Sequence, residues 1–261
     1  MYLNTQTRFD MAVMRDPAER KARQDQKRRL ILRFLRTEIF STPAVLSELI
    51  GTADPRTITR TANALARDGL VVREVVTIGW RNVHLIGITP HGQAMAWRPD
   101  DGEPLIEKVY ERGRVGLTII DHTLDLQRLR IRLSRAGWKG WMNADQIAPG
   151  ARANAMVRNK AYKRPDALVR HPERGVIAIE CERSIKSMKR YQAIVESHLA
   201  GIKTGSFSAA VWTCPTPELA AALRRVLDSI GYVRVQGQSM KLGPGERAKL
   251  LVTDYESIVT L

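Results

Sequence analysis

The chain has 261 residues, enough for two compact domains, and its 42 Lys and Arg residues outnumber its 27 Asp and Glu residues by 15. This surplus favours a nucleic-acid partner, because each phosphate neutralised by Lys or Arg releases condensed counterions. Two cysteines exclude a disulfide framework and a zinc cluster, and the sequence lacks both a signal-peptide block and an apolar run of the ~20 residues that cross a bilayer. We therefore expect a cytoplasmic protein without a membrane segment.

Residues 1–23 carry mixed charge with weak periodicity, which predicts a basic N-terminal arm. The following segment, residues 24–97, has a compact helical pattern. Its first helix is expected to end near Arg36, and Thr42-Pro43 and Asp54-Pro55 each start another helix, because Thr and Asp cap helices and Pro suits the first helical position.

A hairpin follows these helices, with strands at residues 70–77 and 83–88 around a loop tip at 78–82, and Thr89-Pro90 starts a short helix. The order of three helices, hairpin and helix resembles the winged-helix fold of bacterial regulators. The resemblance implies DNA binding, with the start of the third helix reading base edges in duplex DNA. The residues expected to contact DNA are Arg56, Thr57, Thr59 and Arg60 on this helix and Trp80 and Arg81 at the hairpin tip.

Residues 98–113 are polar and contain Pro and Gly, so we expect a linker there. Residues 114–261 are expected to form a second domain that begins with a helix over 121–136. The apolar runs that follow predict the element order αβββαβ. The expected fold class is thus α/β (α+β), with a winged helix-turn-helix followed by this second domain.

Three carboxylates mark the predicted strand hairpin of the second domain. Glu180 and Glu182 lie two residues apart and therefore share one face of a strand, while Cys181 points to the other face. The turn of the hairpin brings Asp166 back toward the same end. Converging carboxylates repel one another unless a cation neutralises them, and a hard divalent ion with oxygen ligands, Mg²⁺ or Mn²⁺, suits such a site.

The residues Pro165-Asp166 and Glu180-Cys181-Glu182 resemble the PD-(D/E)xK nuclease motif. The resemblance implies a restriction-endonuclease-like αβββαβ fold in which Asp166 and Glu180 bind the metal. The motif's lysine position holds Glu182, which is therefore a candidate third ligand. In several branches of that superfamily the lysine lies on the following helix, where Lys189 is our first candidate and Lys186 our second.

A narrower resemblance covers most of the chain. A winged helix, a helix with a histidine and the segment "PDA…IECERSIKSMKRY" are similar to the replication-relaxation family, which includes MobC-type plasmid mobilisation relaxases. The matching residues are His122, Pro165, Asp166, Glu180, Glu182, Lys189 and Tyr191. The resemblance implies metal-dependent nicking at a plasmid origin of transfer during conjugation, together with an accessory mobilisation or coupling protein.

Other interpretations stay open. His122 lies on an apolar helix face, where a packed core histidine is as consistent as a catalytic one, and Tyr191 fits packing beside the site better than covalent attack. A non-catalytic transcription or replication regulator with a degenerate nuclease fold is the first alternative function. A restriction or repair endonuclease is the second. The sequence predicts neither the DNA target nor the oligomeric state.

Overall fold

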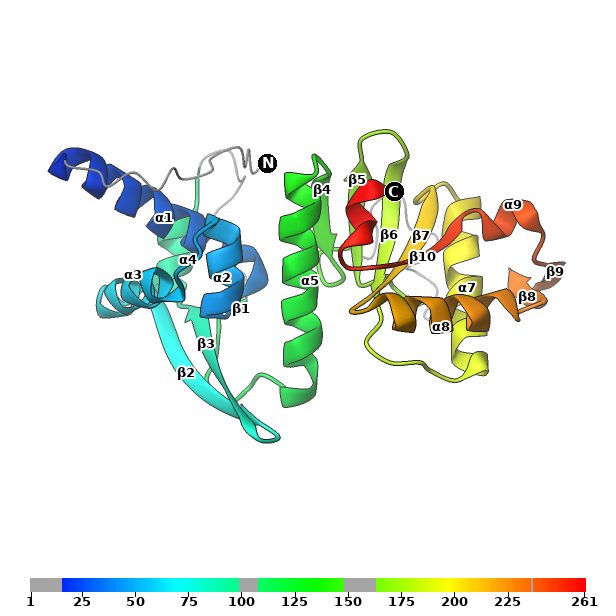
Figure 1. Cartoon of the computed structure of the whole chain (residues 1–261), viewed down its shortest axis with the longest axis horizontal. Coiled ribbons are helices and arrows are strands. Elements are labelled where there is room, and N and C mark those ends of the chain that lie inside the picture. Colours follow the sequence, from blue (N-terminus) through cyan, green and yellow to red (C-terminus); the bar gives the residue numbers. More distant parts are fainter. Residues whose placement is uncertain (1–15, 99–107, 148–162, 236) are drawn as a thin grey trace. The chain divides into compact units, whose positions relative to one another are not determined.

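The computed structural model describes residues 16–98, 108–147, 163–235 and 237–261. It is a mixed α/β structure whose described residues form two compact units, the first ending at Ile131 and the second starting at Arg132 (Figure 1). Within these residues, no helix combines the length and the apolar character needed to cross a membrane.

Up to residue 98, the described part of the first unit contains four helices and a small sheet. The helices are α1 (Pro17–Glu38), α2 (Pro43–Ile50), α3 (Pro55–Arg67) and α4 (Pro90–Ala96). The strands are β1 (Phe40–Ser41), β2 (Val71–Ile78) and β3 (Arg81–Ile88). Strands β2 and β3 form an antiparallel hairpin, and β1 pairs with the other edge of β3.

One local signal starts all four of these helices. Asp16, Thr42, Asp54 and Thr89 each accept a backbone hydrogen bond at a helix start and precede a proline. The helix starts expected at Thr42, Asp54 and Thr89 are confirmed. The expected arm over 1–23 is wrong for residues 17–23, because Asp16-Pro17 starts α1 there; residues 1–15 lie outside the described residues.

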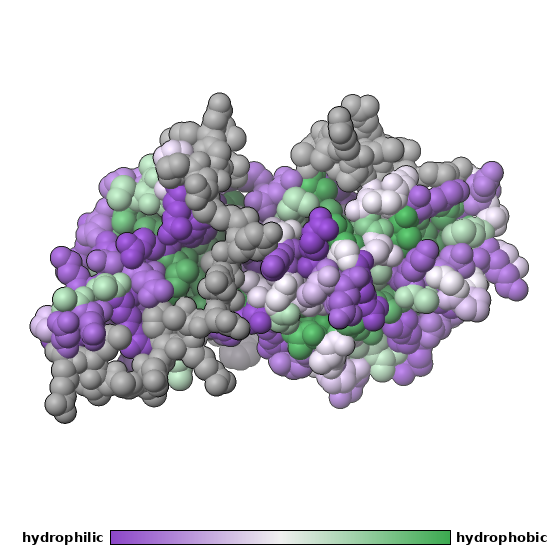
Figure 2. Space-filling model, turned by 90° about the horizontal axis from the view of Figure 1, so that it is seen from above, coloured by the Kyte–Doolittle hydropathy of each residue, from purple (hydrophilic) through white to green (hydrophobic). Residues whose placement is uncertain are grey.

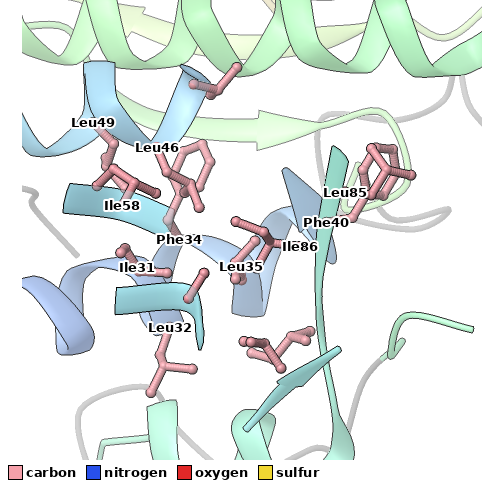
Figure 3. Close-up of a cluster of buried hydrophobic side chains, with 14 of the residues drawn as sticks. Ile31, Leu32, Phe34, Leu35, Phe40, Leu46, Leu49, Ile58, Leu85 and Ile86 are labelled. Carbon is pink, nitrogen blue, oxygen red and sulfur yellow. The ribbon is translucent and has the colours of Figure 1, made fainter. Parts of the chain in front are cut away.

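The core of the first unit is built from one face of each helix and from the hairpin. Ile31, Phe34 and Leu35 of α1 pack with Leu46 of α2 and Ile58 of α3, and all five are almost fully buried (Figure 3). Their spacing along each helix places them on one side of it, which is the pattern that made these helices predictable.

The helix α5 (Leu117–Arg135) corrects the expected boundary between the domains. Its residues through Ile131 belong to the first unit, although we expected the second domain to begin at residue 114. The physical reason is a buried side chain: Gln127 accepts a hydrogen bond from Ser41 Oγ (2.7 Å) and donates one to the Phe40 carbonyl (2.6 Å). Such a pairing satisfies polar groups that burial would otherwise leave unbonded.

Part of the expected linker is also packed on the first unit. Residues 99–107 lie outside the described residues, but Tyr110 is buried, with its ring centroid 6.0 Å from that of Phe40. The Tyr110 backbone N–H donates to the Ile88 carbonyl (3.0 Å). Gly87 makes room for this ring, because a Cβ at Gly87 would lie 2.0 Å from Tyr110 Cγ.

A five-stranded sheet organises the second unit, in the order β10-β7-β6-β5-β4. Its strands are β4 (Lys139–Asn143), β5 (Ala167–His171), β6 (Gly175–Cys181), β7 (Ala209–Cys214) and β10 (Leu250–Asp254). Neighbouring strands from β4 to β6 are antiparallel, whereas β6, β7 and β10 run parallel. The central position of β6 explains its continuous burial from Ile177 onward.

Helices complete the second unit. They are α7 (Met188–Lys203), α8 (Pro217–Asp228), the single turn α9 (Pro244–Arg247) and a 3-10 helix at Ser257–Thr260. A two-stranded hairpin of β8 (Tyr232–Val235) and β9 (Gln238–Lys241) lies between α8 and α9. From α5 onward, the described elements follow the order helix, three strands, helix, strand. The helix expected from Ser184 begins four residues later, and β9 was not predicted.

Candidate functional site

Asp166 and Glu180 form the centre of an acidic cluster on the sheet of the second unit. Ala167 pairs with Ile179 in the antiparallel β5–β6 register, and the Asp166 N–H donates to the Ile179 carbonyl (3.0 Å). Continuing this register by one pair sets Asp166 opposite Glu180, so both side chains leave the sheet on the same face. Asp166 Oδ2 also accepts a hydrogen bond from the Cys181 N–H (2.9 Å).

The ammonium group of Lys163 neutralises this pair of carboxylates. Lys163 Nζ forms an ion pair with Glu180 Oε2 and lies 3.9 Å from Asp166 Oδ1. Burial opposes the charged form of Lys163, but the carboxylates of Glu180 and Asp166 outweigh burial and raise its pKa. Two like charges opposite each other across a strand pair are thereby held together by one cation.

Glu180 is also bound from the helix that covers the sheet. Only 1% of Glu180 is exposed, and its Oε1 lies 2.9 Å from Nε2 of the fully buried His198 on α7. The His198 ring packs edge-on against Trp212 of β7, with 5.1 Å between ring centroids. A buried carboxylate is tolerated when partners of this kind replace the lost water.

Glu182 has a separate set of partners. Its Oε2 accepts a hydrogen bond from Lys186 Nζ (2.7 Å), and its N–H donates to the Thr213 carbonyl (2.9 Å). Tyr191, at the start of α7, is fully buried. Burial, with the hydrogen bond to the Glu182 carboxylate, raises the pKa of Tyr191 to about 12, so the neutral phenol acts here as a hydrogen-bonding group.

The alternation predicted for the β6 side chains agrees with these contacts. Glu180 and Glu182 both meet residues that belong to or precede α7, whereas Cys181 Sγ lies 2.9 Å from Tyr255 Oη at the end of β10. Of the two lysines predicted as catalytic candidates, Lys189 is exposed on α7, whereas Lys186 reaches the carboxylate of Glu182. His122 lies on the part of α5 that belongs to the first unit.

The cluster offers two oxygen ligands to one cation position. Asp166 Oδ1 and Glu180 Oε2 both face Lys163 Nζ, and carboxylate oxygens are the donors that Mg²⁺ and Mn²⁺ prefer. In the side-chain arrangement of the described residues, no three acidic, histidine or cysteine side chains are grouped closely enough to hold a metal ion. Glu182, the expected third ligand, is bound instead to Lys186.

Sequence reasoning missed two residues of this cluster. Lys163 lies three residues before Asp166, and its backbone N–H donates to Ser197 Oγ (3.1 Å) on α7, a non-local contact that directs the lysine toward the carboxylates. His198 carried a usable signal, because it lies seven residues after Tyr191 and therefore on the same face of α7.

The residues of the first unit that were predicted to contact DNA lie in two places, at the start of α3 and at the tip of the β2–β3 hairpin. Arg56 and Arg60 are exposed on α3, whereas Thr57 and Thr59 are half-buried. The Thr57 hydroxyl donates to the capping Asp54 carboxylate (3.4 Å). The start of α3 therefore presents two guanidinium groups to solvent.

The tip of the β2–β3 hairpin carries the other two predicted DNA contacts. Trp80 is 95% exposed, the highest value among the large apolar side chains of the described residues. Arg81 is also exposed, and its guanidinium forms an ion pair with Asp121 of α5. The ion pair connects the hairpin tip to α5, and the indole of Trp80 projects into solvent.

Comparison of the chain with protein-family models, curated proteins and solved structures gives no match.

Proposed function

We propose that this protein is a DNA endonuclease that binds duplex DNA through a winged helix in its first unit and cleaves a phosphodiester in its second unit. The observation that carries the proposal is the pair of carboxylates, Asp166 and Glu180, opposed on adjacent strands and directed at one cationic atom. A pair of this kind is suited to a divalent cation beside a phosphate.

The cation would be Mg²⁺ or Mn²⁺, held by Asp166 and Glu180, and it would supply Lewis-acid stabilisation of the charge on the scissile phosphate. In this proposal the cation would take the place of the Lys163 ammonium between the two carboxylates. His198 and the Cys181 N–H hold Glu180 and Asp166 in place. Lys186 keeps Glu182 neutralised at the edge of the site.

Recognition of the duplex is assigned to the first unit. The order of three helices, a hairpin and a further helix supports the proposal of a winged helix, in which the third helix would enter the major groove. The exposed guanidinium groups of Arg56 and Arg60 suit base edges or phosphates, and Trp80 suits the minor groove or the backbone beside it.

The sequence resemblance to plasmid mobilisation relaxases narrows the proposed reaction to strand nicking at an origin of transfer. An accessory mobilisation or coupling protein is then the expected partner. A restriction or repair endonuclease would use the same cluster on another target, so the DNA substrate distinguishes these functions.

One observation favours a second candidate, a DNA-binding regulator without nuclease activity. The ammonium of Lys163 already neutralises the carboxylates that the metal would need. In a regulator, the Lys163 ion pairs would be a permanent structural feature of the second unit.

A plasmid relaxation assay separates the two functions. The substrate is a supercoiled plasmid that carries the DNA flanking the gene for this protein. It is incubated with wild type, Glu180→Gln or the control Glu173→Gln, in the presence of Mg²⁺, Mn²⁺ or EDTA. Glu173 is exposed in the turn between β5 and β6. We expect open-circle product with wild type and Glu173→Gln only when metal is present, and a loss of at least ~100-fold in Glu180→Gln. If neither the wild type nor any variant nicks the plasmid although all of them bind DNA normally, the result would favour the second candidate, a regulator without nuclease activity.

A further inference from the structure

The first thirteen residues of α1, residues 17–29, form a basic surface and contribute no side chain to the hydrophobic core of the first unit. Buried positions on this 22-residue helix begin at Ile31. Residues 17–29 contain six basic side chains and two acidic ones. The basic residues are Arg20, Lys21, Arg23, Lys27, Arg28 and Arg29, and the acidic ones are Glu19 and Asp25.

The composition of this surface excludes a packing role. From residue 17 to residue 29 the segment has no apolar side chain larger than proline or alanine, so it has no apolar seam for pairing with a second helix. Hydrophilic residues also make up most of the coloured surface at the left end of the first unit in Figure 2. A polar helix segment without an apolar seam fits a charged partner in solution better than a protein core.

The positive charges lie close enough together to affect one another. Partial burial, and then repulsion from Arg23 one turn away, lower the pKa of Lys27. Arg20, Lys21 and Arg29 are exposed to solvent. A polyanion relieves such repulsion and releases its own counterions on binding.

The basic part of α1 is attached next to the proposed recognition helix. Arg28 forms an ion pair with Asp68, the residue that caps the end of α3. In Figure 1 the N-terminal turns of α1 and the helix α3 lie at the same end of the first unit. At a rise of 1.5 Å per residue, α1 continues for about 12 Å from Arg28 to Arg20, which corresponds to about 4 base pairs of duplex.

We infer that the basic segment of α1, residues 20–29, binds the phosphate backbone of duplex DNA beside the site occupied by α3, and extends the DNA footprint by about 4 base pairs. The inference rests on the proposed DNA-binding function and adds an interaction that the winged-helix resemblance does not supply. Phosphate contacts of this kind position the protein and raise affinity without reading sequence.

The test measures how the affinity for DNA depends on salt. Binding of the full chain to a fluorescein-labelled 30-base-pair random-sequence duplex is followed by anisotropy between 50 and 300 mM KCl. The α1 variant carries Arg20→Gln, Lys21→Gln and Arg29→Gln, since glutamine retains helix propensity. The control carries Arg225→Gln, Arg234→Gln and Lys249→Gln, three exposed residues of the second unit with the same total charge loss.

We expect the α1 variant to bind more weakly, by about eightfold at 0.1 M salt for each phosphate that it no longer neutralises, and its salt slope to fall by about 0.9 for each such phosphate. The control is expected to remain within about twofold of wild type. Circular dichroism of the α1 variant should match wild type, because the substituted side chains are exposed.

Two outcomes overturn the inference while leaving the proposed function intact. In the first, the α1 variant has the same duplex affinity and salt slope as the control, whereas a variant with both Arg56→Ala and Arg60→Ala binds the duplex more weakly. The other is an α1 variant that loses retention on heparin but keeps the duplex affinity and salt slope of wild type, which would assign α1 to another polyanion. Wild type that does not bind the duplex at 50 mM salt would instead overturn the proposed function, and the inference with it.

Discussion

Glu180 shows how single side chains determine the chemistry of the second unit. A carboxylate on the central strand of a sheet is costly to bury, yet 1% of Glu180 is exposed. Lys163 and His198 occupy its two oxygens, and the carboxylate of Asp166 shares the same ammonium. The ammonium of Lys163 therefore stabilises the two opposed carboxylates in the fold.

Replacing Lys163 with methionine tests this dependence. The variant keeps the aliphatic length but leaves two opposed carboxylates without their ammonium, and we expect the free energy of unfolding to fall by about 3 kcal/mol. If Asp166 and Glu180 can hold a divalent ion, 10 mM Mg²⁺ should raise the melting temperature of Lys163→Met more than that of wild type. Differential scanning calorimetry measures both effects.

Lys203→Met, at the exposed end of α7, is the matched control and should melt as wild type does with and without Mg²⁺. A Lys163→Met protein that is as stable as wild type would contradict the role given to the ammonium. A destabilised variant that does not respond to Mg²⁺ or Mn²⁺ would keep this structural role but contradict metal binding by the pair.

At the scale of the elements, α5 connects the two units along the chain while its residues through Ile131 pack with the first. Gln127 is fully buried and bonds both Ser41 and the Phe40 carbonyl of β1. Farther along the helix, Arg128 forms an ion pair with Glu48 of α2 (3.0 Å). These contacts make α5 part of the first unit rather than the opening helix of the second.

We expect Gln127→Ala to destabilise the first unit by about 2–4 kcal/mol, because the Ser41 hydroxyl and the Phe40 carbonyl lose their buried partners and a cavity remains. Urea denaturation followed by circular dichroism gives this value. Gln24 is exposed on the first half of α1, so Gln24→Ala is the matched control and should change the free energy of unfolding by less than about 0.5 kcal/mol. Equal stabilities of the two variants would show that α5 is not needed by the first unit.

At the scale of the whole molecule, the described residues contain two separate hydrophobic cores, one in each unit. Leu46 is fully buried in the first core and Leu223 in the second. Replacing either leucine with alanine should lower the free energy of unfolding of its own unit by about 2–5 kcal/mol. The other unit should keep its stability, because distant sites without shared contacts act independently.

Hydrogen–deuterium exchange with peptide resolution checks this independence. Leu46→Ala should speed exchange in α1, α2 and α3 and leave β6 and β7 as slow as in wild type, whereas Leu223→Ala should do the reverse. Faster exchange in both units of either variant would mean that the chain unfolds as a single cooperative body. In that case the destabilisation by Gln127→Ala would belong to the whole chain rather than to the first unit.

The element starts of the first unit were predictable because their causes are local. A capping Asp or Thr followed by proline determines a helix start within a few residues, and the alternation of a strand assigns Glu180 and Glu182 to one face. Asp166 and Glu180 were recognisable as a pair for the same reason, since a short hairpin brings them together.

What the tertiary structure decided depends on contacts between distant residues. Lys163 reaches the acidic pair from a loop, His198 reaches it from α7, and Gln127 joins α5 to β1 across more than eighty residues. The amino-acid sequence by itself determined the helix caps, the strand faces and the basic charge of the chain. Only tertiary packing selected which cation meets the carboxylates and which unit includes α5, because side-chain reach and burial are properties of the folded neighbourhood.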